Sequence, residues 1–477
     1  MSLQDIIHLL PLLVLAVTMV IALLSIAFWP RHQVSFWITL TGEFLSLIAL
    51  FFASRDLPQP VTLLFMMDGF ATFYIALILA GGLITTALSY AYISKFSGNK
   101  GEFFLLVLVA TFGSAVLVMS NHFISFFLGA GILSLSLFAL IGYNPLERKS
   151  IEAAIKYLIL VGVASAILLF GMALIYAEVG SMQFSEITFP ANQSATDSTL
   201  LKIGFGLLIA GISFELALVP FHMWTPDVYR GAPAPVAGFV ATVAKAGIFA
   251  LMLRLFTYVS LPVGSALWIE FVLIAIASML LGNILAIVQN SIKSLLAYSS
   301  IAHLGYLMVG FLAGATWSAS ATGFYWVAYF ITTLLAFGIV TSVSDPKNDV
   351  DGIDAYRGLF HRNPWLAVMF VVALLSLTGL PPTGGLIGKV YLAAAGVQGS
   401  VWLLLAALIL GTILGLFYYM RVVMLLFRQP NETSVSSGRV SPGTMVVLTV
   451  LTIALVIMGI FPTPLIDLIN RMVSLIG

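Results

Sequence analysis

Long apolar runs dominate the pattern of this chain. They are about 20 residues long, which is the length that an α-helix needs to cross the hydrocarbon core of a bilayer. The runs are continuous and lack the polar–apolar alternation of membrane β-strands, so they predict helices. Fourteen runs can be distinguished: 9–28, 34–54, 71–93, 103–119, 122–142, 152–177, 202–221, 235–257, 266–288, 295–313, 321–343, 365–397, 401–428 and 444–461.

Prolines interrupt two of these runs. The run 365–397 is too long for one straight span and contains the sequence Leu-Pro-Pro-Thr-Gly-Gly at 380–385. Proline lacks the N–H that continues a helix, so we expect a broken helix there. Pro220 similarly breaks the run 202–221. The pattern predicts an all-α polytopic membrane protein with about 14 transmembrane helices, forming a single membrane domain over 1–477.

Composition agrees with this prediction. The chain is 61% hydrophobic and 8% charged, whereas average proteins have roughly 45–50% apolar and about 25% charged residues. A water-soluble enzyme is therefore excluded. The sequence has no cysteine, which excludes disulfides, iron–sulfur ligation and cysteine-based zinc sites in this chain. A net charge of +1 without a basic tract argues against nucleic acid as a partner.

The basic residues predict the orientation in the membrane. If the loops are numbered from the first span, 14 of the 20 Lys and Arg residues lie in odd-numbered loops, and 4 lie on the other side. Because basic residues favour cytoplasmic loops, we expect both termini on the periplasmic side. Asp5 and the absence of a basic residue before the first run predict that the amino end is not a removable signal.

The carboxyl-terminal tail 462–477 also has a recognisable pattern. Asp467, Asn470, Arg471 and Ser474 occur at helical spacing among apolar residues. This pattern indicates a helix lying along the membrane interface. A simple frayed end is the alternative.

Two lysines lie within apolar runs. Inserting an ionisable group at the bilayer centre costs a free energy of about 2.5–3.5 kcal/mol on insertion scales. Each such residue therefore indicates a function or a stabilising partner. Lys245 lies at mid-span with no charged residue nearby in sequence. We interpret it as a proton relay, and a structural ion pair or a snorkelling side chain is the alternative. Lys389 follows the double proline, and interrupted helices at membrane depth line cavities or ion paths.

Other polar residues in the runs are secondary candidates. Glu215 precedes the Pro220 break, and His222 follows seven residues later, so the two could share a helix face. A carboxylate paired with a neighbouring helix is the alternative for Glu215. Ser299, His303 and Tyr306 form a polar stripe on one helix face. This stripe could carry hydrogen-bonded water, although a lone histidine is often a satisfied core residue.

Two further polar residues are weaker candidates. His122 could sit at the membrane edge, and Glu43 could hold neighbouring helices together. No Walker A loop, Gly-x-Gly-x-x-Gly turn or His-Glu-x-x-His motif is present. We therefore expect no metal, no bound cofactor and no redox chemistry in this chain.

One long motif resembles a known family. The run VPFHMWTPDVYRGAPAPV at 219–236 is similar to the signature of the antiporter-like membrane subunits of respiratory complex I. Its Thr-Pro-Asp-Val-Tyr form resembles that of the N subunit of bacterial NADH:quinone oxidoreductase and differs from the Leu-Pro-Asp-Ala versions of the L and M subunits. Supporting segments are 121–122, 155–157, 293–306, 356–359 and 385–389.

The resemblance implies a fold and a proton path. It implies two inverted five-helix repeats, about 103–257 and 266–428, each with one broken helix. The family's path runs along the membrane midplane through lysines on spans eight and twelve and a histidine on span ten. By resemblance, these roles transfer to Lys245, Lys389 and His303.

Two positions depart from the family pattern. The family usually has a glutamate on span five, where this chain has Gly131, and a lysine on span seven, where it has Glu215. One hypothesis is that Glu215 pairs directly with Lys245. The other is that the first half-channel is degraded and that the chain pumps poorly or not at all.

The resemblance also implies a function. It indicates a proton-translocating subunit of an NADH:quinone oxidoreductase in a bacterial inner membrane. NADH, FMN, iron–sulfur clusters and quinone would be bound by other subunits. The neighbouring antiporter-like M subunit, small membrane subunits and the lipid bilayer would be the partners. A cation/proton antiporter subunit and a non-pumping scaffold of the membrane arm are the alternatives.

Overall fold

Helices make up nearly all of the structure. The computed structural model describes residues 3–55, 57–96, 98–145, 147–187, 198–259, 261–314, 317–345, 349–430 and 440–473. Within these ranges, 12 helical segments are long and apolar enough to cross a membrane. They are α1 (Leu3–Phe28), α2 (His32–Ala53), α3 (Gly69–Ser94), α4 (Gly101–Met119), α5 (Phe123–Ile141), α6 (Arg148–Val179), the run Ala234–Tyr258, α11 (Ala266–Ile287), α12 (Ile292–Ala313), α13 (Ser318–Val343), α17 (Trp402–Leu426) and α18 (Pro442–Ile460).

The other two predicted spans are broken helices. The seventh span consists of α7 (Thr199–Glu215) and the short α8 (Trp224–Gly231), and the twelfth consists of α15 (Pro364–Thr378) and α16 (Gly384–Gln398). The prediction of 14 spans with two interruptions is therefore confirmed. The largest boundary errors are in two runs, because α7 ends at Glu215 and does not continue to residue 221, and α1 begins at Leu3 and not at residue 9.

The run Ala234–Tyr258 changes its helical winding halfway along. It begins as α9 (Ala234–Phe239), continues through one π-helical turn, η2 (Val240–Ala244), and becomes α10 (Lys245–Tyr258). π-helical turns are rare in proteins, and those that occur inside an α-helix are often found at functional sites. This one ends directly before Lys245.

Short elements connect the spans. Strands β1 (Gln59–Pro60) and β2 (Met66–Met67) pair antiparallel between α2 and α3. The 3-10 helix η1 (Phe184–Glu186) follows α6. The 3-10 helix η3 (Ile353–Tyr356) and α14 (Leu359–Arg362) follow α13.

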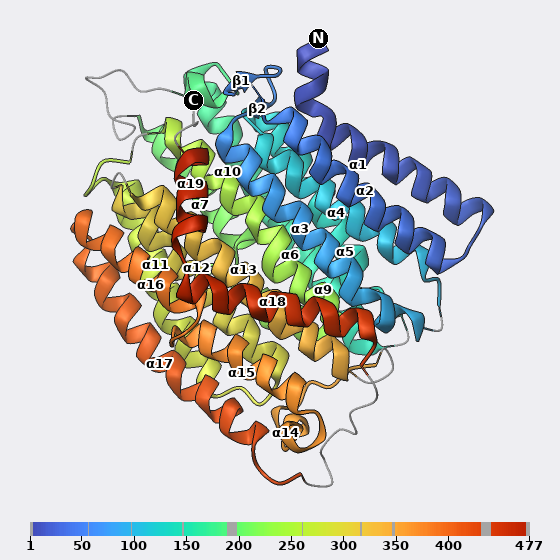
Figure 1. Cartoon of the computed structure of the whole chain (residues 1–477). Coiled ribbons are helices and arrows are strands. Elements are labelled where there is room, and N and C mark those ends of the chain that lie inside the picture. The colour runs from blue at the N-terminus through green and yellow to red at the C-terminus, as the bar shows by residue number, and fades with distance from the viewer. Residues whose placement is uncertain are drawn as a thin grey trace.

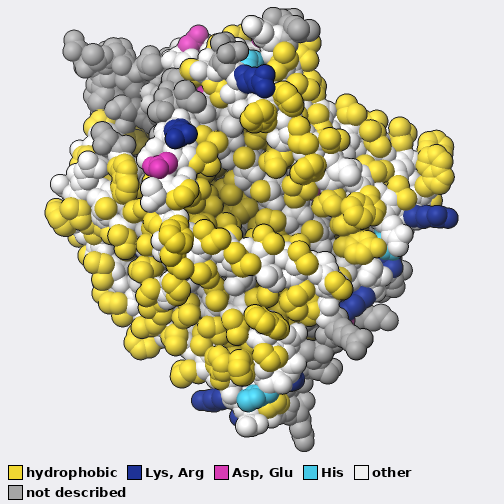
Figure 2. Space-filling view, in the orientation of Figure 1, with side chains coloured by type: hydrophobic (Ala, Val, Ile, Leu, Met, Phe, Trp, Pro, Cys, Tyr) yellow, Lys and Arg dark blue, Asp and Glu magenta, His cyan; other side chains and the backbone are white. Residues whose placement is uncertain are grey.

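Three spans form the centre of the bundle. The run Ala234–Tyr258, α12 and α13 are almost entirely buried, whereas α1, α6 and α18 lie at its outside. In Figure 1, α1 and α2 lie side by side at one edge, and α18 runs diagonally across the front. Figure 2 shows that apolar side chains cover most of this face and that few charged side chains lie on it, mainly toward its upper and lower ends. This distribution suits a lipid environment.

Ion pairs join loops that we predict to lie on one side of the membrane. Lys95, between α3 and α4, contacts Asp345 after α13. Arg230 of α8 contacts Asp351 at 3.1 Å. These contacts agree with the predicted sidedness of the odd-numbered loops. Lys347 and Arg439, which contribute to that prediction, lie outside the residues that the structure describes.

The tail forms a final helix, α19 (Thr463–Val473), which packs against α3 and α13. The expected helix is therefore present in the described part of the tail. Residues 474–477 lie outside that part. A position along the membrane interface stays a prediction, as does the division of the chain into two inverted repeats.

Candidate functional site

Lys245 is the first of two buried lysines that form no ion pair within the described residues. It opens α10 directly after the π-helical turn, and its side chain is buried. Its Nζ donates to Ser300 Oγ of α12 at 2.9 Å. The Tyr329 hydroxyl of α13 donates to the same Ser300 oxygen at 2.8 Å. The Lys245 amine also lies 5.7 Å from the centre of the Tyr229 ring, a cation–π distance.

His303 lies further along α12, among hydroxyl groups. Its Nδ1 is 2.7 Å from the Tyr325 hydroxyl, and its Nε2 is 3.3 Å from the Tyr419 hydroxyl. Tyr419 also contacts Ser299. The imidazole stacks on the rings of Tyr325 and Tyr329, with interplanar angles of 11° and 28°. Both ring nitrogens therefore have hydrogen-bond partners.

Lys389 is the second buried amine, and the helix break supplies its partners. Because α15 ends at Thr378, the last carbonyls of this half-helix have no helical donors. Lys389 Nζ donates to two of them, Thr378 O at 2.9 Å and Leu377 O at 3.1 Å. The carboxyl end of a helix also attracts positive charge through its dipole. The amine lies 5.0 Å from the centre of the Tyr306 ring.

Tyr306 belongs to a third hydrogen-bonded group, which it forms with Asn283 of α11 and Tyr418 of α17. Its hydroxyl accepts from Asn283 Nδ2 of α11 at 2.8 Å. Asn283 Oδ1 accepts from the Tyr418 hydroxyl at 3.0 Å. The structure therefore holds three hydrogen-bonded groups, around Lys245, His303 and Tyr306, and aromatic stacking brings them next to one another. A proton that passes from one group to the next needs a side-chain rotation or an ordered water at each junction.

Glu215 and His222 do not join these groups. Glu215 is buried at the end of α7, and its Oε1 lies 3.5 Å from Ser134 Oγ of α5. No ion pair joins Glu215 to Lys245, whose polar partner is Ser300. The hypothesis of a direct Glu215–Lys245 pair is therefore wrong, because α7 stops there and places the carboxylate against α5. His222 lies in the non-helical break with its ring 6.5 Å from that of Tyr298, so it does not extend the face of Glu215.

Other groups close the Glu215 break. The Trp224 indole N–H donates to Phe214 O at 3.0 Å. The Ser278 hydroxyl of α11 accepts from the Val219 N–H at 2.9 Å. Non-helical backbone at membrane depth is tolerated when protein groups satisfy it in this way.

Gly131, the other departure from the expected pattern, and His122 can now be located. A Cβ added at Gly131 would meet no described atom within 4 Å, so open space adjoins this position of α5. His122 lies at the start of α5, where its Nδ1 accepts from the Ile124 N–H at 3.1 Å. Burial lowers the pKa of the His122 imidazole from its usual value. His122 therefore caps a helix at the edge of the bundle.

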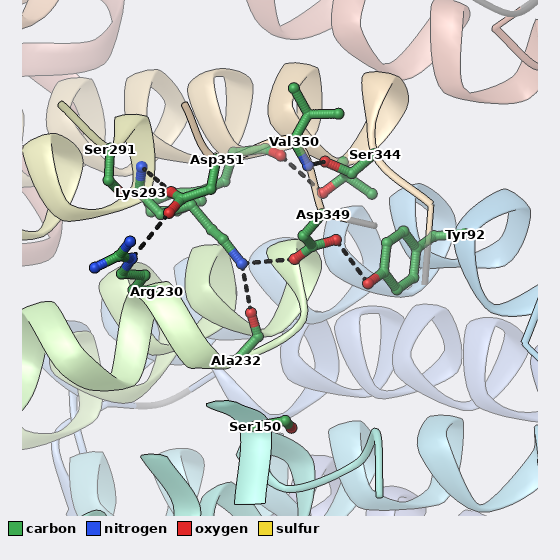
Figure 3. A network of polar contacts seen from close by, with 12 residues as sticks. Tyr92, Ser150, Arg230, Ala232, Ser291, Lys293, Ser344, Asp349, Val350 and Asp351 are labelled. Atoms are coloured by element: carbon green, nitrogen blue, oxygen red, sulfur yellow. Dashed lines mark hydrogen bonds and ion pairs between the residues drawn. The ribbon is translucent and has the colours of Figure 1, made fainter. Parts of the chain in front are cut away.

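A charged network holds the loop after α13 against the ends of α8 and α12 (Figure 3). Lys293 of α12 is buried, and its Nζ contacts Asp349 Oδ2 at 2.6 Å and Ala232 O at 2.8 Å. The Tyr92 hydroxyl donates to the other Asp349 oxygen at 2.8 Å. Burial, followed by the nearby Asp349 charge, raises the pKa of the Glu147 carboxyl above its usual value. The network fixes the start of the helix that carries Ser300 and His303.

Sequence reasoning missed the aromatic part of the site. Tyr325 and Tyr329 occur four residues apart within an apolar run, which is the spacing of one helix face. This pattern is the signal that could have identified them. Asn283 stands singly in its apolar run, and Tyr419 is one of an adjacent tyrosine pair with Tyr418. Only the packing of α11 and α17 on α12 brings Asn283 and Tyr419 to the site.

Comparison with known proteins decides the family. The family described as NADH:quinone oxidoreductase/Mrp antiporter, TM, matches residues 120–415, which is more than half of the chain. The chain belongs to this family. The match spans the seventh and twelfth helices with their breaks, as well as Lys245, His303 and Lys389.

Solved structures of this antiporter-like fold extend the match to the whole chain. A chain of respiratory complex I from Thermus thermophilus has a TM-score of 0.83 and 33% identity, and the alignment covers 96% of this chain and 98% of that chain. A chain of an archaeal membrane-bound sulfane sulfur reductase has a TM-score of 0.83 at 22% identity, with 100% and 98% covered. A chain of the Mrp complex from Dietzia sp. has a TM-score of 0.86 at 19% identity, with 99% and 97% covered.

These similarities confirm the predicted all-α polytopic fold. The chain is an antiporter-like membrane subunit of the NADH:quinone oxidoreductase/Mrp antiporter family. The last two likenesses concern the fold alone, because their identities are low.

Proposed function

We propose that this antiporter-like subunit translocates protons in an NADH:quinone oxidoreductase, in the position of the N subunit. The observation that carries the proposal is the pair of buried amines, Lys245 and Lys389, between which lie hydrogen-bonding side chains around His303. Neither amine forms an ion pair with a carboxylate in the described part of the chain. A permanent charge at either position would be costly.

The contacts of both amines allow the protonation state to change. A neutral lysine amine keeps two N–H donors and gains a lone pair, whereas the charged form has three donors. Lys389 uses two donors, for Leu377 O and Thr378 O, so it satisfies both carbonyls in either form. Lys245 contacts a hydroxyl, which can accept from an ammonium group or donate to a neutral amine. Each amine can therefore gain and lose a proton without breaking its contacts.

Energy for the transfer would come from outside this chain. Moving one charge across the membrane costs about 2.3 kcal/mol per 100 mV. Electron transfer would take place in other subunits, with NADH, FMN, iron–sulfur clusters and quinone bound there. Conformational or electrostatic changes would reach this chain through membrane-arm neighbours, among them the M subunit. The protein would lie in the bacterial inner membrane with both termini periplasmic.

Two other functions have specific support. The family also includes Mrp antiporter chains, which favours a cation/proton antiporter subunit. The Thr225–Tyr229 motif supports the complex I assignment over this alternative. A non-pumping scaffold is favoured by Gly131 and by the separation of Glu215 from Lys245. Copurification with peripheral redox subunits would separate complex I from an antiporter.

Replacement of one amine tests the proposal directly. In the assembled complex in closed vesicles, Lys245→Met is expected to lower NADH-driven proton pumping about tenfold, a barrier increase of about 1.4 kcal/mol. Lys202→Met is the matched control, because Lys202 is an exposed lysine near the start of α7. If pumping and electron transfer both remain at the control level in Lys245→Met, the scaffold function is correct.

A further inference from the structure

A second buried polar track runs along α2, away from the central path. Ser35, Thr39, Glu43 and Ser46 follow one another at intervals of three or four residues, and none has any exposed surface. This spacing places them on one face of the helix. The opposite face carries exposed apolar residues such as Trp37. The polar face therefore points into the protein, where Glu43 contacts α3 and α4 and Ser46 donates to Pro11 O of α1.

The first two hydroxyls of this track have no partner within the described residues. Ser35 Oγ and Thr39 Oγ1 are buried and make no hydrogen bond with the protein. Buried serine and threonine usually bond to the carbonyl one turn back, as Thr111 and Ser89 do in this chain. Buried polar groups without a protein partner are ordinarily hydrogen-bonded to water. Ser35 and Thr39 therefore suit a hydrated passage.

This track begins at a pocket on the predicted inner face. A surface pocket of about 490 Å³ is lined by residues that include His32, Lys100, Gly101 and Glu102. A Cβ added at Gly101 would lie 2.8 Å from Ser35 Oγ, so Ser35 adjoins the wall of the pocket. Gly101 therefore separates the polar pocket from the first hydroxyl of the track.

Glu43 lies at the inner end of the track, between α3 and α4. Its Oε2 is 3.1 Å from Thr86 Oγ1, and its Oε1 is 3.5 Å from Thr111 Oγ1. Thr111 donates its single hydroxyl proton to Val107 O at 2.9 Å, so toward Glu43 it can only accept. No described cation forms an ion pair with Glu43. These contacts fit a protonated carboxylic acid that donates to Thr111, since a buried, unpaired carboxylate would be strongly unfavourable.

The cluster around Glu43 borders the helix of the central path. Ser114 lies one turn beyond Thr111 on α4, and its hydroxyl is buried without a described partner. A Cβ added at Gly247 of α10 would lie within 3.1 Å of Ser114 atoms, so the two helices touch here. The helix α10 also carries Lys245.

We infer that Glu43 is an additional proton-exchange site, loaded from the pocket at His32 and Glu102 along Ser35 and Thr39. The inference rests on the proposed proton translocation, to which it adds a residue outside the central path. It gives α2 a function besides packing. The exchanged group is the Glu43 carboxyl proton, which passes toward Ser114 and α10 and is replaced by a proton from the pocket along Ser35 and Thr39.

Infrared spectroscopy of the assembled complex tests this route. The carboxylic-acid band of Glu43 is identified as the band that is lost in Glu43→Gln, and its shift in D₂O reports proton exchange. Thr39→Val keeps the side-chain shape and removes the hydroxyl, so exchange is expected to slow about tenfold, equivalent to about 1.4 kcal/mol in the barrier. Thr41→Val is the control, because Thr41 lies on the exposed face of α2.

Three results would overturn the inference: no Glu43 acid band, a band that never exchanges in the unmodified complex, or equal exchange in Thr39→Val and Thr41→Val.

Proton pumping gives an independent measurement. Glu43→Gln preserves the contacts to Thr86 and Thr111, and pumping is expected to fall at least about twofold. Unchanged pumping in Glu43→Gln would refute this inference alone. Unchanged pumping in Lys245→Met would refute the proposed function.

Discussion

At the scale of single residues, the site depends on hydroxyl groups that can both donate and accept. Lys245 and His303 contact hydroxyl oxygens, whereas Lys389 donates to two backbone carbonyls, and none of these partners is a carboxylate. A hydroxyl can reverse its hydrogen bond when a neighbouring amine or imidazole changes charge. A carboxylate partner would instead hold the charged form in place. The local chemistry therefore favours transfer over permanent pairing.

Neighbouring tyrosines on α17 offer a matched test of this idea. Tyr419 contacts His303 and Ser299, whereas Tyr418 donates to Asn283. Tyr419→Phe is expected to slow proton pumping about tenfold, which is about 1.4 kcal/mol in the barrier. Tyr418→Phe should have a smaller effect, because it leaves the contacts of His303 intact. Initial pumping rates of the two variants in closed vesicles would test this difference. Equal rates in Tyr419→Phe and Tyr418→Phe would contradict the role given to Tyr419.

The sequence identified the site residues that belong to types rarely found in apolar runs. Lys245, Lys389 and His303 stand out because charged or titratable side chains are rare in apolar runs. Tyrosines are ordinary in such runs, so Tyr325 and Tyr329 could not be distinguished before their contacts were known. The expected Glu215–Lys245 pair failed because sequence spacing cannot show which neighbouring helix a side chain meets.

At the scale of elements, the helix breaks create the binding groups of the site. The break between α15 and α16 exposes the carbonyls that Lys389 binds. Prolines predicted where both breaks occur, because proline cannot continue the hydrogen-bond ladder. They did not predict the partners, since Lys389 lies eleven residues after Thr378 and reaches it only because the chain folds back.

Close packing at this break gives a second prediction. A Cβ added at Gly385 would lie 1.9 Å from Ser376 O, whereas one at Gly131 would meet no described atom. Gly385→Ala is therefore expected to destabilise the protein by about 1–3 kcal/mol through overpacking. Gly131→Ala should be neutral or stabilise by up to about 1 kcal/mol, because alanine favours helix.

Thermal unfolding of the purified protein in detergent, followed by circular dichroism, would measure both changes. Equal midpoints for the two glycine variants would show that the α15–α16 break tolerates a side chain. That outcome would contradict the described packing of Gly385 on Ser376.

The network at the start of α12 gives a third prediction. Asp349 pairs with the buried Lys293, whereas Asp345 pairs with the exposed Lys95. Asp349→Asn leaves a buried charge without its partner and is expected to cost about 3–5 kcal/mol. Asp345→Asn should cost about 0–1 kcal/mol, because surface ion pairs contribute little. Thermal unfolding followed by circular dichroism would measure both losses of stability. Equal losses in Asp349→Asn and Asp345→Asn would contradict the difference in burial between the two ion pairs.

At the scale of the whole molecule, periodicity and charge predicted most of the architecture. Fourteen apolar runs became 12 continuous spans and two broken ones. The most buried spans are less apolar than the peripheral ones, with a mean hydropathy of 1.5 for α12 and 1.8 for α13 against 2.8 for α1. Hydropathy alone does not identify the central spans, because α2 also has a value of 1.8 and is less than half buried. Their central position follows from packing against several neighbours, which the pattern of one span does not record.

Membrane orientation can be tested without background labelling, because the chain has no cysteine. Val263 lies in an even-numbered loop and Gln429 in an odd-numbered one, and both are exposed. In intact cells, an impermeant thiol reagent is expected to label Val263→Cys and to spare Gln429→Cys, since basic loops stay cytoplasmic. The reverse labelling would place both termini in the cytoplasm.

The central claim is that the two buried amines change protonation during turnover. Solid-state NMR of the assembled complex with ¹⁵Nζ-labelled lysine measures this directly, with signals assigned by their loss in Lys245→Met and Lys389→Met. During steady NADH oxidation, both amines are predicted to show neutral and charged populations that differ from those at rest. Signals that stay fully charged at rest and throughout turnover would contradict the account.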